Sequence, residues 1–144
     1  MSDTTNGASL DTVAGAICEI MGVESPKGAA SPNVDMLNYA NTVFNGEKAD
    51  RIFMYNPDAI AQWIDEKYPK LMREVPAITD IAVPFQTVMP SVTPVCFGTM
   101  YTGAQPAVHG ITKYMKPVIK IDTFFDALIR AGKKVAIIAD TDCS

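Results

Sequence analysis

The sequence predicts an α/β fold with a mostly parallel sheet and helices on both of its faces. The runs RIFMY, IAVPFQTVM and KVAIIA have the composition of short buried strands. Segments with the apolar spacing of helices separate them. Strands that alternate with helices form parallel sheets covered on both faces. We therefore expect one sheet with strands near 51–55, 83–89 and 134–139.

Apolar residues at helical spacing place the helices, and glycine or Asn-Gly marks several of their ends. Helices are expected at 10–21, Val34–Phe44, Asp58–Tyr68, Thr93–Gly103 and 122–132. In the third of these, Ile60, Trp63 and Ile64 are expected to face the core. Asp122 is expected to cap the last helix.

Composition limits the classes of protein that this chain can represent. Its 144 residues are 48% hydrophobic, enough for one core, and no apolar stretch is long enough to span a membrane. A net charge of −4 without basic clusters argues against nucleic acid as a partner. The polar start lacks the features of a signal peptide, and three scattered cysteines suggest no disulfide framework. We expect a cytoplasmic protein with a disordered segment 1–8, in which residues 9–144 form one domain or part of one.

Thr93 and Pro94 mark the most informative position in the chain. They follow the expected strand at 83–89 and open a helix, because proline is favoured in the first turn. Unpaired N–H groups and the helix dipole at such a point favour an anion. Thr93 is therefore a candidate nucleophile, although an ordinary N-cap is the commoner role for threonine here. Ser91 and Cys96 are weaker candidates, since Pro94 sets the register and Cys96 has no acidic or histidine neighbour in sequence.

The segment beyond Thr93 carries a family resemblance. Thr93, Thr102-Gly103, Pro106 and His109-Gly110-Ile111 resemble the nucleophile segment of the alkaline phosphatase superfamily, in its type I phosphodiesterase/nucleotide pyrophosphatase branch. The sulfatase branch has cysteine or serine in place of the threonine and arginine four residues later, where this chain has Phe97. The resemblance implies an alkaline phosphatase-like fold with Thr93 as the catalytic nucleophile.

The resemblance also implies a metal site. Members use two divalent metal ions, commonly zinc, to activate the threonine, and the reaction passes through a phospho-enzyme. Asn56 stands where the superfamily has a metal-ligating Asp at the end of the first strand, so Asn56 and Thr93 are candidate metal ligands. Asp58 could supply the missing negative charge. Tyr114 stands where pyrophosphatase relatives carry an Asn that contacts the phosphoryl group, which makes it a candidate substrate-binding residue.

The resemblance leaves several ligands without counterparts. The family's Asp with a nearby His, its Asp-His pair and its later His are missing, and the one histidine, His109, lies in a structural turn. Asp140–Asp142 are expected to be ordinary turn residues. We therefore expect an N-terminal portion of a longer enzyme, inactive as this chain alone.

Two functions remain open at this point. The first is a metal-dependent hydrolase of small phosphodiesters or phosphomonoesters. The second is a non-catalytic remnant or interaction module that keeps only the nucleophile half. Metal-ligand motifs encoded directly after the Ser144 codon would favour the first, and a stop codon would favour the second.

Overall fold

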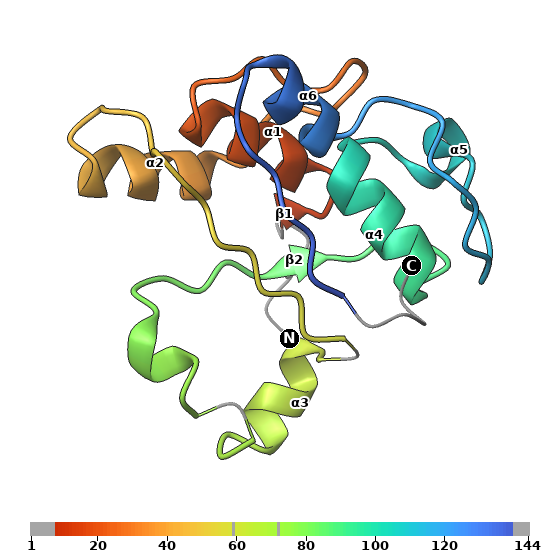
Figure 1. Cartoon of the computed structure of the whole chain (residues 1–144). Helices are drawn as coiled ribbons and strands as arrows, with labels where there is room; N and C mark the ends of the chain where they lie inside the picture. The colour runs from red at the N-terminus through yellow and green to blue at the C-terminus, as the bar shows by residue number, and fades with distance from the viewer. Residues whose placement is uncertain (1–7, 59, 72, 140–144) are drawn as a thin grey trace.

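The structure, a computed structural model, describes residues 8–58, 60–71 and 73–139 (Figure 1). Helices make up most of its regular structure, so the chain is of mixed α/β class with little sheet. The elements are β1 (Ala8–Ser9), α1 (Thr12–Ile20), α2 (Val34–Val43), α3 (Gln62–Lys67), a 3-10 turn (Pro76–Ile78), β2 (Phe85–Gln86), α4 (Thr93–Thr102), α5 (Pro106–His109) and α6 (Phe124–Arg130). In this part of the chain, no helix has the length and apolar character needed to cross a bilayer.

The sheet of the described residues has two short parallel strands. Ala8 of β1 lies opposite Phe85 of β2, and Ser9 lies opposite Gln86. The Leu10 N–H extends the pairing by donating to the Gln86 carbonyl over 3.1 Å. Only Phe85–Gln86 of the strand expected at 83–89 therefore forms. The expectation that residues 1–8 are disordered is wrong at Ala8, and residues 1–7 lie outside the described residues.

The strands expected at 51–55 and 134–139 do not form. Both segments are extended chain without ladder pairing, and Figure 1 shows them as smooth traces beside β2. Met54, Phe85 and Val135 nevertheless pack against one and the same core cluster. The three expected strands thus converge on one core, although two of them lack the hydrogen-bonded neighbour that a strand requires.

The core lies between α1, α4 and α6, which pack together in the upper part of Figure 1. Its buried members are mostly small or medium-sized apolar side chains: Val13, Ala14, Ile17, Cys18, Met21, Ala49, Phe124, Ala127 and Leu128. The helix expected at 10–21 is confirmed as α1, and the chain leaves it through Gly22 at φ +68°. Burial raises the pKa of the Cys18 thiol to about 11, so this cysteine stays protonated and unreactive.

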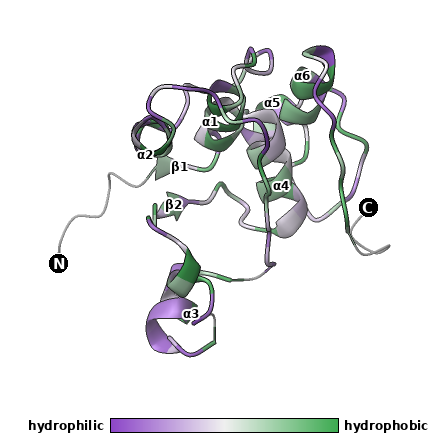
Figure 2. Cartoon of the chain, turned by 60° about the vertical axis from the view of Figure 1, so that its left-hand side comes forward, coloured by the Kyte–Doolittle hydropathy of each residue, from purple (hydrophilic) through white to green (hydrophobic). Residues whose placement is uncertain are grey.

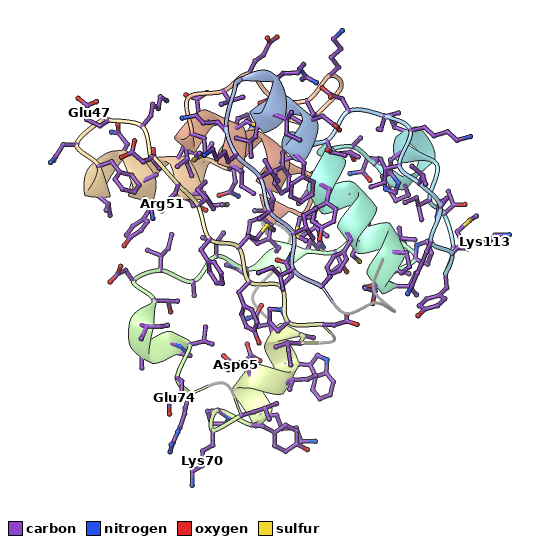
Figure 3. All side chains as sticks on the ribbon, viewed as in Figure 1. Glu47, Arg51, Asp65, Lys70, Glu74 and Lys113 are labelled. Atoms are coloured by element: carbon purple, nitrogen blue, oxygen red, sulfur yellow. The ribbon has the colours of Figure 1, made fainter. Side chains whose placement is uncertain are left out.

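Two helices lie at the periphery and bury no residue completely. They are α2 and α3, and α3 extends away from the other helices below β2 (Figure 1). Figure 2 shows α3 as mostly hydrophilic, and in Figure 3 Asp65 lies on α3 with Lys70 and Glu74 near it. Trp63 is 60% exposed and Ile60 is also exposed, so the expectation that they face the core is wrong. An apolar face is buried only where another element packs on it.

The last helix begins with a capping box formed by residues other than the expected cap. The Thr123 hydroxyl accepts from the Asp126 N–H, and the Asp126 carboxylate accepts from the Thr123 N–H. Asp122, the expected cap, instead forms a bidentate ion pair with Arg130 at 2.5 and 2.7 Å. This ion pair lowers the pKa of the Asp122 carboxyl group.

His109, the last residue of α5, packs against α4. The Ile111 N–H donates to its Nδ1 at 3.2 Å, so the neutral ring carries its proton on Nε2, which lies 3.0 Å from Thr99 Oγ1. Gly98 is required opposite the ring, because a Cβ there would lie 2.8 Å from His109 Cε1. His109 therefore packs as a structural residue, as the sequence predicts.

The burial of His109 predicts a pH-dependent stability. Burial lowers the pKa of His109 below 6.5, its ordinary value, so the unfolded chain binds the proton more readily. The contribution of His109 to the free energy of unfolding should be constant above pH 6.5 and should become destabilising as the pH decreases from there through the lowered folded-state value. Urea unfolding at several pH values would measure this. The variant His109→Asn should show a flatter profile, and an equally steep one would contradict the assignment.

Candidate functional site

Thr93 is the first residue of α4 and does not cap it. The N-cap is Val92, and among the described residues no side chain forms a capping hydrogen bond at this end of the helix. The half-buried Thr93 hydroxyl instead donates a hydrogen bond to Asp58 Oδ1 over 3.0 Å. The alternative role of Thr93 as an ordinary N-cap is therefore wrong. The hydroxyl of the expected nucleophile is hydrogen-bonded to a residue 35 positions earlier in the chain.

Asn56 contacts the same helix at a second position. Its amide Nδ2 donates to the Tyr101 hydroxyl at 3.5 Å, a long hydrogen bond. Tyr101 packs against the rings of Phe97, Phe124 and Phe125 with centroid distances of 5.5, 5.8 and 5.0 Å. Burial raises the pKa of Tyr101, while the bond to Asn56 acts in the opposite direction. The phenol therefore stays neutral and can accept this bond.

The segment Asn56–Asp58 thus lies along α4. The sequence predicts that Asn56 and Thr93 meet at one edge of a sheet, but the described segment 51–55 forms no strand, so the two residues do not follow neighbouring strands. The segment Asn56–Asp58 is instead linked to α4 by two side-chain hydrogen bonds, one between Thr93 and Asp58 and one between Asn56 and Tyr101. Tyr101 carries no sequence signal of its own, because it lies among the apolar residues of its helix. Nothing in the sequence marked it as the partner of Asn56.

Tyr114 does not join this site. It lies on the loop between α5 and α6, its side chain is 72% exposed, and within the described ranges no hydrogen bond links it to Thr93. The aspartates at 140–142 lie outside the described residues. A surface hollow of about 450 Å³ lies elsewhere, lined by Lys27, Ile119, Lys120, Ile121, Asp122, Asp126 and Arg130.

The described residues do not fit the two-metal centre that the resemblance implies. Among residues 8–58, 60–71 and 73–139, no group of three or more His, Cys, Asp and Glu side chains could hold a metal ion. His109 is buried and hydrogen-bonded at both ring nitrogens. Asn56 and Asp58 offer oxygen atoms but form too small a ligand set by themselves.

Comparisons with protein-family models, with curated proteins and with solved structures found no match to this chain. We therefore infer function from the residues around Thr93 and from the chemistry of a threonine hydroxyl beside a carboxylate.

Proposed function

We propose that this chain carries the nucleophile half of a phosphoric ester hydrolase. Thr93 attacks a small phosphodiester or phosphomonoester and forms a phospho-enzyme that water hydrolyses. The observation that carries the proposal is the hydrogen bond from the Thr93 hydroxyl to Asp58, made at the start of a ten-residue helix. The Thr93 hydroxyl is thus hydrogen-bonded to a carboxylate and does not cap its own helix.

The start of α4 suits a phosphate group. Backbone N–H groups in the first turn of a helix and the helix dipole favour negative charge at this end. The proposal includes an alkaline phosphatase-like sheet, and the convergence of Met54, Phe85 and Val135 on one core supports it. Tyr114 stays a proposed phosphoryl contact. The resemblance implies divalent cations, but because the ligand set does not fit them, we assign no step to a metal.

Labelling of the chain by an activated diester tests the proposal. The whole chain is incubated with bis(para-nitrophenyl) phosphate, either with zinc or with a chelator, and intact mass and peptide mapping follow the adduct. An aryl phosphoryl adduct on Thr93 is expected in at least one arm, formed slowly and without rapid turnover. Ser91→Ala is the matched control, since its hydroxyl bonds to Thr87 Oγ1 at 3.1 Å and should not be labelled. Absence of an adduct, or an adduct on Ser91, would overturn the proposal.

A second candidate function, an interaction module, is favoured by the exposed apolar side chains of the two extended segments. Phe53 is 90% exposed and Ile138 is 98% exposed. An extended segment without ladder pairing and with exposed apolar side chains can pair with an extended segment of another protein molecule.

Association measurements test this second function. The chain should associate as its concentration rises in light scattering, and Phe53→Ser combined with Ile138→Ser should reduce this association. The midpoint of unfolding should not change, because these side chains bury little area. A monomer at every concentration, with no binding of a hydrophobic dye, would contradict the module.

A further inference from the structure

We propose that Asp58 is the proton acceptor that activates Thr93. This inference depends on the proposed function and names a second catalytic residue for it. The resemblance assigns activation of the threonine to metal ions, and it aligns Asn56, not Asp58, with the family's ligating Asp. The described residues do not supply the ligands for those ions. The hydroxyl of Thr93 nevertheless already has a base beside it.

The direction of the hydrogen bond supports this role. An ionised carboxylate can only accept, so the hydrogen between Thr93 Oγ1 and Asp58 Oδ1 belongs to the threonine. The distance of 3.0 Å lies within the range required of a general base. The proton that must leave during attack is therefore already directed at the atom that would receive it.

The surroundings of the pair also support it. Thr93 is half-buried at the start of α4, whereas Asp58 is exposed and can return a proton to water. The segment that carries Asp58 has a second contact with the helix, through Asn56 and the Tyr101 hydroxyl. Tyr101 is itself held by the rings of Phe97, Phe124 and Phe125. Two contacts therefore link this segment to α4.

The proposed step transfers one proton and exchanges one bond from phosphorus to oxygen for another. The Thr93 O–H bond breaks and its proton passes to Asp58 Oδ1, while the threonine oxygen forms a bond to phosphorus. The bond from phosphorus to the leaving oxygen breaks, and the leaving group departs with the electron pair as a phenolate or alkoxide. The products are a threonine phosphoester and a neutral Asp58, which then loses its proton to water.

Substitution and chemical rescue test Asp58. Adduct formation on Thr93 should slow by about 10²–10⁴-fold in Asp58→Asn, which keeps the shape of the side chain and loses the base. Asp58→Ala should be equally slow, and added formate should restore part of its rate by supplying a carboxylate in the vacated space. A merely structural role for Asp58 would give no rescue. Asp65→Asn, a substitution on α3, is the matched control and should label at the wild-type rate.

The outcomes separate this inference from the proposed function. If Asp58→Asn labels Thr93 as fast as the wild type, Asp58 is not the base and the proposed function stands. If wild-type labelling disappears in the chelator arm, Asp58 acts with a metal and the inference is overturned. If the wild type is labelled in neither arm, both proposals fail together. Circular dichroism and the unfolding midpoint verify that each variant is folded.

Discussion

Replacing Thr93 with Ala is expected to abolish labelling by the activated diester and to leave the fold intact. Loss of an attacking hydroxyl removes the covalent route entirely, so the adduct should fall below detection. The cost in stability should be small, because Val92 and not Thr93 is the N-cap of α4. We expect the free energy of unfolding to change by less than about 0.5 kcal/mol, against about 1 kcal/mol for a lost cap.

Thr93→Ser is the matched control for this prediction. Serine keeps a hydroxyl that can reach Asp58 Oδ1 and should therefore retain labelling at the same residue. Intact-mass spectrometry gives the labelled fraction, and urea unfolding gives the stability of each variant. An alanine variant that is still labelled, or that unfolds while the serine variant stays folded, would show that Thr93 is structural.

Gly103→Ala is expected to cause the largest loss of stability. Gly103 ends α4 at φ +70°, a left-handed conformation that costs a residue with a side chain about 1–2 kcal/mol. A Cβ there would also lie 2.6 Å from the Ala29 Cβ and 3.2 Å from the Ala14 Cβ. Both neighbours are short side chains without rotamers that could yield, so overpacking should add about 1–3 kcal/mol.

Gly110→Ala separates the two causes of this loss. Gly110 has φ +81° and nothing within 4 Å of an added Cβ, so it reports backbone strain alone. Denaturant unfolding should give a clearly smaller loss for Gly110→Ala than for Gly103→Ala. Equal losses would show that the contact between Gly103 and Ala29 is not tight in solution.

Local signals located several helices correctly. The apolar spacing before Gly22, the Asn45-Gly46 stop and the Pro94 start predict α1, α2 and α4, and all three are confirmed. These signals succeed because a helix closes its hydrogen bonds within one segment and its ends are set by nearby residues. The α/β class is confirmed at the same coarse level.

The strands were predicted less well because strand pairing is not local. Apolar character placed 51–55 and 134–139 on the core through Met54 and Val135, but a strand also needs a partner in register. The strand that pairs with β2 is β1, which consists of two residues, Ala8 and Ser9. The sequence around β1 is not enriched in apolar or β-branched residues, so it did not predict a strand there. The predicted burial of the α3 face is wrong for a related reason: burial needs a distant element to pack on that face, and Trp63 stays 60% exposed.

The candidate site was also predicted only in part from the sequence. The sequence by itself determined that a hydroxyl opens α4 and that short polar residues follow the 51–55 segment, because proline and glycine fix backbone geometry locally. Only the tertiary structure decided that Thr93 donates to Asp58 and that Asn56 contacts Tyr101. Those contacts join residues 35 and 45 positions apart, and their geometry depends on how α4 packs against the core.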